Sequence, residues 1–361
     1  MGNINFFIKE STKLLKPSGL DTLILYVTSR CNAKCGFCFY GEELNRMPEL
    51  NLQQIVKVSE SLKSLNGLLI GGGEPFLRAD LFDIINAFAK NCHMDVVQIP
   101  TNGFFTNRIV SFVNQITAAL PNLNLSIQVS LDAIGEKHDV LRQLKGCFKQ
   151  AEETIAVLKS LRNKNCRLRI LVVSVLTPET LKDCRNFAFY VRNRIDPDYH
   201  WFEPVRDMPA MAQNLKLTAD TVNFLRDNLK YYLTKVKGTS SSLYASRLFN
   251  DLITKFSLNN FDIAYDNFIH KKQWPVTCCA GRRMAVLYPD GTLAACELRQ
   301  EHVNIKDYDF NIHKALKNNV FEKVKNDTHK HACDCTHGCF IPTSVRYAPR
   351  ELLKIALSKN L

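Results

Sequence analysis

Short apolar runs alternate with helix-like stretches from residue 22 to residue 204, and this alternation is the feature that most limits the fold. Six runs read as strands: TLILYVT, GLLIG, DVVQIP, NLSIQVS, RLRILVVSVL and YHWFEP. Amphipathic segments long enough for helical crossovers separate them, with helices expected, among others, over residues 51–66 and 179–191. Such alternation is typical of parallel sheets. The sequence therefore predicts an α/β fold, a partial (β/α)6 barrel with fewer strands than the eight of a complete barrel.

The carboxyl ends of parallel strands form the edge of the sheet where ligands bind. Three segments are expected at that edge, because each follows one of the first three apolar runs. They are SRCNAKC (29–35), GGGEP (71–75) and TNG (101–103). We expect the functional site to be built from them.

Three cysteines, Cys31, Cys35 and Cys38, lie in the first of these loops. Two thiols would suffice for a redox pair, and a structural zinc site would need a fourth cysteine or histidine, which this loop lacks. Three thiolates on a four-iron cluster leave one iron open to a further ligand. The spacing therefore favours a [4Fe–4S] cluster with one open coordination position.

The cysteine loop is followed by further motifs in a recognisable order. CxxxCxxC after the first strand, with Gly72–Pro75 after the second, resembles the radical S-adenosylmethionine (SAM) superfamily. SLDAIGEKHDVLR, over Ser130–Arg142, is similar to the segment after the fourth strand in members with a SPASM domain. The resemblance covers residues 20–205 as a partial barrel and residues 276–340 as a SPASM or Twitch auxiliary-cluster region.

This resemblance implies a definite chemistry. Cys31, Cys35 and Cys38 would hold a [4Fe–4S] cluster whose open iron binds SAM. Cleavage of SAM then yields a 5′-deoxyadenosyl radical that abstracts hydrogen from an unreactive C–H bond, so the protein's tasks are positioning and the exclusion of water. An external electron donor such as flavodoxin or ferredoxin is implied as a partner.

The resemblance also implies a SAM pocket. Gly72 and Gly73 lack a Cβ and allow a close approach to the methionyl amino group, beside which Glu74 adds negative charge. Arg142 offers a two-pronged match to the methionyl carboxylate. Taken alone, these residues would read as a turn and a surface charge, and Phe37 as core. The implied cofactor-binding residues are Phe37, Gly72, Gly73, Glu74, Asn102, Ser130 and Arg142.

Six more cysteines lie between residues 278 and 339, in TCCAG, AACEL and CDCTHGC. Their spacing resembles the SPASM or Twitch pattern only in part, and six thiols are too few for two closed clusters, which need about eight ligands. We expect one auxiliary [4Fe–4S] cluster. The expected ligands are Cys279, Cys296, Cys335 and Cys339, with Cys278 and Cys333 as substitutes.

A zinc site is the alternative interpretation of this region, because His329, His331 and His337 lie beside the cysteines and mixed Cys/His ligands suit that metal. A third alternative is a region without metal. The remaining four cysteines lie in apolar or helical contexts and read as core thiols. These four are Cys92, Cys147, Cys166 and Cys184.

The pattern of apolar residues and motifs changes along the chain, which suggests a division into parts. An Asp-Gly pair at 290–291 between two apolar runs predicts a hairpin. The expected parts are an N-terminal extension (1–20), the barrel (21–205), a helical connection (206–275), a SPASM/Twitch-like α+β appendage (276–345) and a C-terminal amphipathic helix (346–361).

The last helix carries Leu352, Leu353, Ala356 and Leu357 on one face and basic residues elsewhere. Such a helix either packs on its own domain or makes peripheral membrane contact. No apolar run approaches the ~18 residues of a membrane span. The chain is large and opens without a long apolar signal region, so we expect reduced thiols and a cytoplasmic location.

We expect an enzyme that oxidises, crosslinks or epimerises a peptide. The same chemistry on a sugar, nucleotide or lipid is the alternative, and a pure iron–sulfur electron-transfer protein is a third class. The formal charge of +12 favours an acidic ligand, but the basic residues are scattered, so nucleic-acid binding is not favoured. Three charged residues at or just after the end of the sixth run are candidates for substrate contact: Glu203, Arg206 and Asp207. The alternative interpretation is that they form an ion-pair cluster at the surface.

Overall fold

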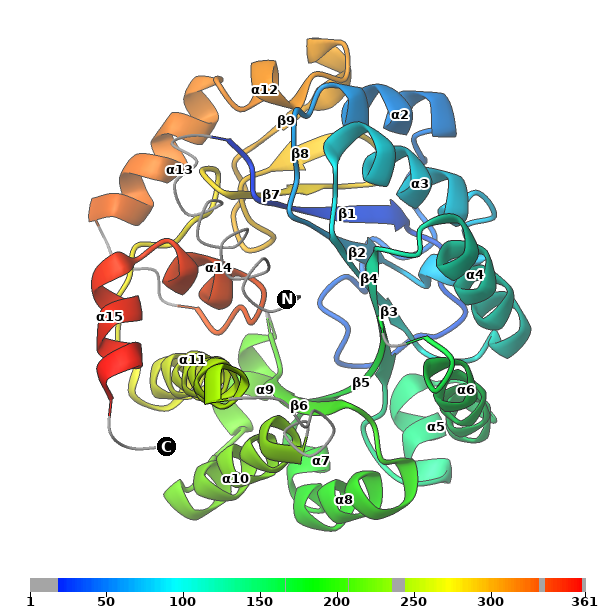
Figure 1. Cartoon of the computed structure of the whole chain (residues 1–361), viewed down its shortest axis with the longest axis vertical. Helices are drawn as coiled ribbons and strands as arrows, with labels where there is room; N and C mark the ends of the chain where they lie inside the picture. The colour runs from blue at the N-terminus through cyan, green and yellow to red at the C-terminus, as the bar shows by residue number, and fades with distance from the viewer. Residues whose placement is uncertain (1–18, 166, 207, 236–243, 331–334, 359–361) are drawn as a thin grey trace. The chain divides into compact units, whose positions relative to one another are not determined.

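The computed structural model describes residues 19–165, 167–206, 208–235, 244–330 and 335–358. These residues form two compact units, whose elements are labelled in Figure 1. The sheet unit joins Leu20–Lys216 to Met284–Lys323, and the helical unit joins Leu217–Arg283 to Val324–Leu361.

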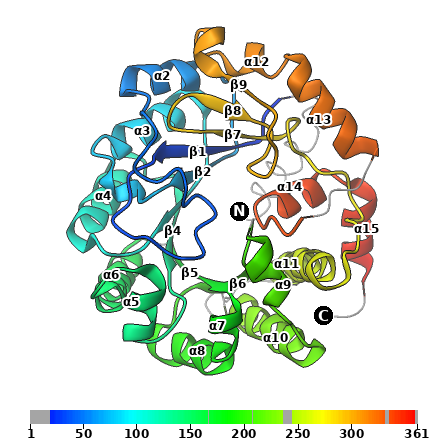
Figure 2. The same cartoon turned by 180° about the vertical axis from the view of Figure 1, so that it is seen from behind.

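The sheet unit is built on one nine-stranded sheet in the order β6-β5-β4-β3-β2-β1-β7-β8-β9. Strands β1 to β7 all run in the same direction, β8 runs antiparallel to β7, and β9 runs antiparallel to β8. Figure 2 shows β1 to β6 in blue to green. The bounds are β1 (Thr22–Thr28), β2 (Gly67–Gly72), β3 (Val96–Thr101), β4 (Asn124–Ser130), β5 (Leu168–Leu176), β6 (Tyr199–Pro204), β7 (Met284–Leu287), β8 (Thr292–Ala294) and β9 (His302–Asn304).

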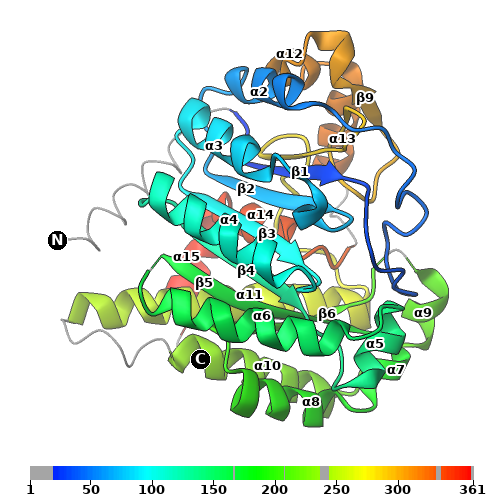
Figure 3. The ribbon, with the colours of Figure 1, turned by 90° about the vertical axis from the view of Figure 1, so that its right-hand side faces the viewer.

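Helices connect the successive parallel strands, and Figure 3 shows α3, α4 and α6 side by side along one face of the sheet. A capping box starts α2, because Asn51 and Gln54 each accept the other's backbone N–H. The elements are α2 (Leu52–Glu60), η1 (Pro75–Leu77), α3 (Leu81–Cys92), α4 (Thr106–Ala119), α5 (Glu136–Arg142), α6 (Cys147–Arg162), α7 (Pro178–Leu181), α8 (Cys184–Tyr190), η2 (Val191–Ile195), α9 (Pro209–Asn214), η4 (Ile305–Tyr308) and α12 (Ile312–Ala315).

The six strands expected from the sequence are confirmed, and so is the partial barrel. Two expected helices differ from the structure. The helix expected over 51–66 ends at Glu60, where Ser61 closes it with backbone bonds to the preceding turn. The helix expected over 179–191 is divided into α7 and α8, because Thr177 and Pro178 begin a separate short turn that ends at Leu181.

The Asp-Gly hairpin is confirmed as β7 and β8, but its place in the fold was not foreseen. Strand β7 pairs in parallel with β1, with Met284 opposite Thr22 and Leu287 opposite Leu25. Both sides of β1 are therefore paired, and all of its residues are buried. Residues 284–323, expected in the appendage, belong to the sheet unit.

The helical unit contains α10, α14 and α15, which contact α11. Its last helix, α15, buries Ile355 and Glu351 but leaves Leu353 and Leu357 61% and 71% exposed. Contact of this exposed face with a membrane surface stays a prediction. Among the described residues, no helix has the length and apolar character needed to cross a membrane. The bounds are α10 (Ala219–Lys235), α11 (Tyr244–His270), α14 (Phe340–Arg346) and α15 (Pro349–Leu357), while α13 (Asn319–Lys330) crosses the boundary of the units.

Candidate active site

The three loop cysteines are half-buried beyond the carboxyl end of β1. Burial, with smaller contributions from the charges of Glu74, Cys35 and Cys38, raises the pKa of the Cys31 thiol to about 12, so the three thiols are within electrostatic range. A bound cation would reverse this penalty on the thiolates. Among the described residues, no three ligating side chains gather closely enough for a single metal ion. The donor set is instead three soft thiols, which suit an iron–sulfur cluster.

The glycine turn after β2 packs against the start of the cysteine loop. The Gly73 N–H donates to the Thr28 carbonyl at 2.9 Å, and the Glu74 N–H donates to the Arg30 carbonyl at 2.8 Å. A Cβ on Gly72 would lie 2.2 Å from the Thr28 oxygen, and one on Gly73 would lie 2.2 Å from the Arg30 oxygen. The backbone of the cysteine loop therefore leaves room only for glycine at both positions. This packing is a reason for the two glycines that the sequence pattern did not reveal.

Glu74 is buried, and its carboxylate joins the turn after β2 to the end of β3. It accepts hydrogen bonds from Thr101 Oγ1 at 2.8 Å, from the Asn102 N–H at 2.7 Å and from the Phe76 N–H at 3.2 Å. Burial raises the pKa of this carboxyl to about 7, against the opposing effect of those hydrogen bonds. The structure thus gives Glu74 a positioning role, and its contact with a ligand stays a prediction.

An amide pair joins the cysteine loop to the end of β3. Asn102 Nδ2 donates to Asn32 Oδ1 at 2.8 Å, while Asn32 Nδ2 is buried and has no hydrogen-bond partner among the described residues. Leaving a buried N–H unpaired costs about 1–3 kcal/mol. Such an orphaned donor inside the cysteine loop fits a site that is completed by a polar ligand. Asn32 was not singled out in the sequence, although it stands inside the motif.

Arg142, at the end of α5, is turned toward the cysteine loop. Its Nε and Nη2 both lie 2.8 Å from Asp132 Oδ2, its Nη1 lies 4.0 Å from Cys35 Sγ, and its guanidinium is 5.9 Å from the Phe37 ring centre. The Lys34 N–H also donates to the Arg142 carbonyl at 3.1 Å. Arg142 is therefore a buried ion-pair partner beside the thiols and not a solvated helix charge.

Asp132 was missed by the sequence analysis, although it lies within SLDAIGEKHDVLR. Its other oxygen accepts from the Val175 N–H at 2.9 Å, so the carboxylate that holds Arg142 is itself held by β5. Its own N–H donates to His138 Nδ1 at 3.1 Å, and burial lowers the pKa of His138 to about 4. Ser130, half-buried at the end of β4, is the last of the expected pocket residues.

Glu203 and Arg206, expected to contact substrate, form an ion pair after β6, with Arg206 Nε 3.2 Å from Glu203 Oε1. Arg206 also lies 3.6 Å from Glu297 Oε2 and stacks over the Phe39 ring at 4.6 Å. Tyr26 of β1 donates to Glu297. The cluster therefore joins the β6 edge of the sheet to the cysteine loop and to the segment after β8. Asp207 lies outside the described residues.

The second group of cysteines is divided between the units. Cys296 is buried in the sheet unit, whereas Cys278 and Cys279 are buried and Cys335 and Cys339 half-buried in the helical unit. Cys333 and His331 lie outside the described residues.

Within the helical unit, the Cys279 N–H donates to Ser344 Oγ at 3.0 Å, and Trp274 Nε1 donates to the Cys335 carbonyl at 2.8 Å. His329 is exposed, and His337 is fully buried against Phe340. Of the expected core thiols, Cys92, Cys147 and Cys184 are confirmed as buried, and Cys166 lies outside the described residues.

The family model described as the Radical SAM superfamily matches residues 25–188. The GTP 3′,8-cyclase of Limosilactobacillus fermentum is 29% identical over 175 residues, which are 46% of this chain and 50% of that protein. The GTP 3′,8-cyclase of Lactiplantibacillus plantarum is 30% identical over 235 residues, 62% of this chain and 67% of that protein. The match thus spans half of the first curated relative and two thirds of the second.

The structure titled "Native anSMEcpe with bound AdoMet and Cp18Cys peptide" has a similar fold. Its TM-score is 0.57 at 17% identity, and the similarity covers 94% of this chain and 99% of that one.

Proposed function

Because this chain belongs to the radical SAM superfamily of enzymes, we propose that it cleaves SAM reductively and abstracts hydrogen from an unreactive C–H bond of its substrate. The observation that carries the proposal is the position of the Asp132–Arg142 pair beside Cys35, one of the three loop thiols beyond the carboxyl end of β1. The bound cluster and SAM would supply the radical chemistry, and the protein supplies binding, orientation and exclusion of water.

The chain's own residues take distinct tasks in this proposal. Cys31, Cys35 and Cys38 hold the cluster. Arg142, oriented by Asp132, presents its guanidinium to the carboxylate of SAM, a charge-assisted interaction that a partly closed site strengthens. Two polar residues at the strand ends, Asn102 and Ser130, are proposed to bond the polar atoms of SAM, and Phe37 is proposed to contact its adenine.

Replacement of Arg142 tests this assignment. Arg142→Lys keeps a cation beside Asp132 but loses the fork, so we expect the fold to persist while SAM binding weakens. Arg142→Ala should cost about 2 kcal/mol of SAM binding, near thirtyfold in affinity, with the lysine variant between it and the wild type.

Calorimetric titration of reconstituted protein with SAM measures this change. Arg142→Ala also leaves the buried Asp132 unpaired, so thermal unfolding of each variant without SAM is the control. Wild-type affinity in both variants would leave Arg142 a structural residue only.

A peptide is the substrate class that we propose first. Two arginines at the carboxyl edge are paired with carboxylates, Arg142 with Asp132 and Arg206 with Glu203 and Glu297. This balance suits a substrate of low charge better than a nucleoside triphosphate. The nucleotide remains the second candidate, because the curated relatives are named GTP 3′,8-cyclase and the chain carries a net charge of +12.

The experiment is anaerobic incubation of reconstituted protein with SAM and a reductant, followed by chromatographic assay of 5′-deoxyadenosine. We expect 5′-deoxyadenosine without added substrate at a low rate. Stimulation by short peptides encoded beside the gene, with a mass change in the peptide, would support the first candidate, and conversion of GTP would support the second. No 5′-deoxyadenosine under any of these conditions would leave iron–sulfur electron transfer as the function.

We also propose one auxiliary [4Fe–4S] cluster, with Cys279, Cys296, Cys335 and Cys339 as ligands. Its support is the burial of Cys279 and Cys296, which suits closed ligation, and the protein contacts of Cys279 and Cys335. Four thiolates would close this cluster to SAM and leave it suited to electron transfer. Flavodoxin or ferredoxin is the proposed source of electrons.

A further inference from the structure

One side chain outside the cysteine motif holds both backbone polar groups of Cys31. Asn45 Oδ1 accepts from the Cys31 N–H at 3.0 Å, and Asn45 Nδ2 reaches the Cys31 carbonyl at 3.4 Å. The Asn45 N–H in turn donates to the Ser29 carbonyl at 2.8 Å. Two hydrogen bonds thereby join Asn45 to Cys31, 14 positions away, and a third joins it to Ser29.

The backbone conformation at residue 45 permits an asparagine but does not by itself require one. Its φ is 62°, in the left-handed region. Asparagine tolerates this region better than most residues, and glycine tolerates it freely. Glycine would therefore meet the backbone requirement without the amide, so the two bonds to Cys31 are the contribution specific to the asparagine side chain.

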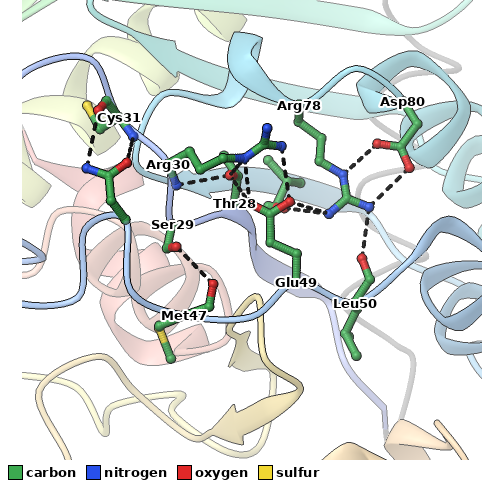
Figure 4. A network of polar contacts seen from close by, with 11 residues as sticks. Thr28, Ser29, Arg30, Cys31, Met47, Glu49, Leu50, Arg78 and Asp80 are labelled. Carbon is green, nitrogen blue, oxygen red and sulfur yellow. Dashed lines mark hydrogen bonds and ion pairs between the residues drawn. The ribbon is translucent and has the colours of Figure 1, made fainter.

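The segment that carries Asn45 is itself anchored, as Figure 4 shows. Ser29 Oγ donates to the Met47 carbonyl at 3.2 Å. Glu49 pairs with Arg30 at 3.0 Å and with Arg78 at 3.3 Å, and it also accepts from Thr28. The segment 47–49, which follows Asn45 along the chain, is thus bonded to the residues that precede Cys31.

Arg78 connects the chain that follows Asn45 to strand β1 of the sheet. Its guanidinium donates to the Val27 carbonyl of β1 at 3.0 Å and to the Leu50 carbonyl at 2.9 Å, and it is ion-paired with Asp80. The Arg78 side chain is only 5% exposed, so these bonds are shielded from water. Asn45 therefore reaches Cys31 from a rigid base.

We propose that Asn45 is a positioning residue that holds Cys31 in its ligating conformation before iron binds. The inference rests on the proposed function, because it takes Cys31 as a cluster ligand. A loop that is already in place loses less conformational freedom on binding the cluster, so the bound cluster dissociates more slowly. Asn45 acts through Cys31 and touches neither iron nor SAM in this proposal.

The test is Asn45→Gly, which removes the amide and keeps the left-handed backbone. Asp309→Gly is the matched control, because Asp309 is exposed, has a φ of 52° and lies in the same unit after η4. Iron release to a chelator from anaerobically reconstituted protein is followed by absorbance. The part of the absorbance change that is missing in Cys31→Ala protein is assigned to iron release from the first cluster. Thermal unfolding of the protein before reconstitution reports the fold.

We expect iron release from the first cluster to be about fivefold faster in Asn45→Gly, as the loss of about 1 kcal/mol of hydrogen bonding implies. Asp309→Gly should match the wild type, and Asn45→Asp, which keeps the acceptor for the Cys31 N–H, should fall between. Equal release rates in Asn45→Gly and Asp309→Gly would overturn the inference. A Cys31→Ala protein with the iron content and release profile of the wild type would instead refute the cluster assignment itself.

Discussion

Protein carrying Cys31→Ala, Cys35→Ala and Cys38→Ala is expected to form no 5′-deoxyadenosine from SAM. These thiols are the proposed ligands of the one cluster with an open iron, and an auxiliary cluster closed by four thiolates offers SAM no position. Chromatographic assay of 5′-deoxyadenosine after anaerobic reconstitution measures the loss. Undiminished production would remove the assignment of the cysteine loop.

Iron analysis of the same proteins separates the two proposed clusters. Wild-type protein should hold about eight irons, and the triple variant and the Cys279→Ala, Cys296→Ala pair about four each. A wild-type content near four with stoichiometric zinc would favour the Cys/His zinc site. The same iron content without zinc would mean that the second group of cysteines binds no metal.

Gly73→Ala is expected to have the second largest effect. The new Cβ would lie 2.2 Å from the Arg30 oxygen, 2.6 Å from the Arg30 carbonyl carbon and 2.9 Å from the Ser29 oxygen. These are backbone atoms, so relief requires the glycine turn and the cysteine loop to separate, which breaks the bonds of Gly73 to Thr28 and of Glu74 to Arg30. We expect a loss of about 3 kcal/mol in the free energy of unfolding, at the upper end of overpacking penalties.

Gly36→Ala is the matched control for this prediction. Gly36 lies inside the same cysteine loop, and a Cβ there would meet nothing within 4 Å. Denaturant unfolding of the two variants before reconstitution measures the difference in stability, and iron content after reconstitution shows whether the loop still assembles. Equal stability of the two variants would mean that the turn and the loop are not packed as described.

The sequence predicted those parts of the fold that depend on local pattern. Alternating apolar and amphipathic stretches predicted the six strands β1 to β6, because burial of a strand between crossover helices leaves an apolar run in the sequence. The Asp-Gly pair predicted the β7–β8 hairpin for a similar reason. The hairpin's pairing with β1 could not be predicted, because residues 284–287 pair with a strand more than 250 positions away through backbone groups that every sequence possesses.

The candidate site divides in the same way. By itself, the sequence determined which chemistry is available, because the three thiols lie within one short loop and their spacing is visible in the chain. Only the tertiary structure decided which partners orient them. Asp132 holds Arg142 beside Cys35, the backbone of Thr28 and Arg30 requires Gly72 and Gly73, and Asn45 reaches Cys31 from a segment anchored by Arg78. These contacts join residues that are distant in the chain, and the free energy of each depends on burial and geometry, which no local pattern records.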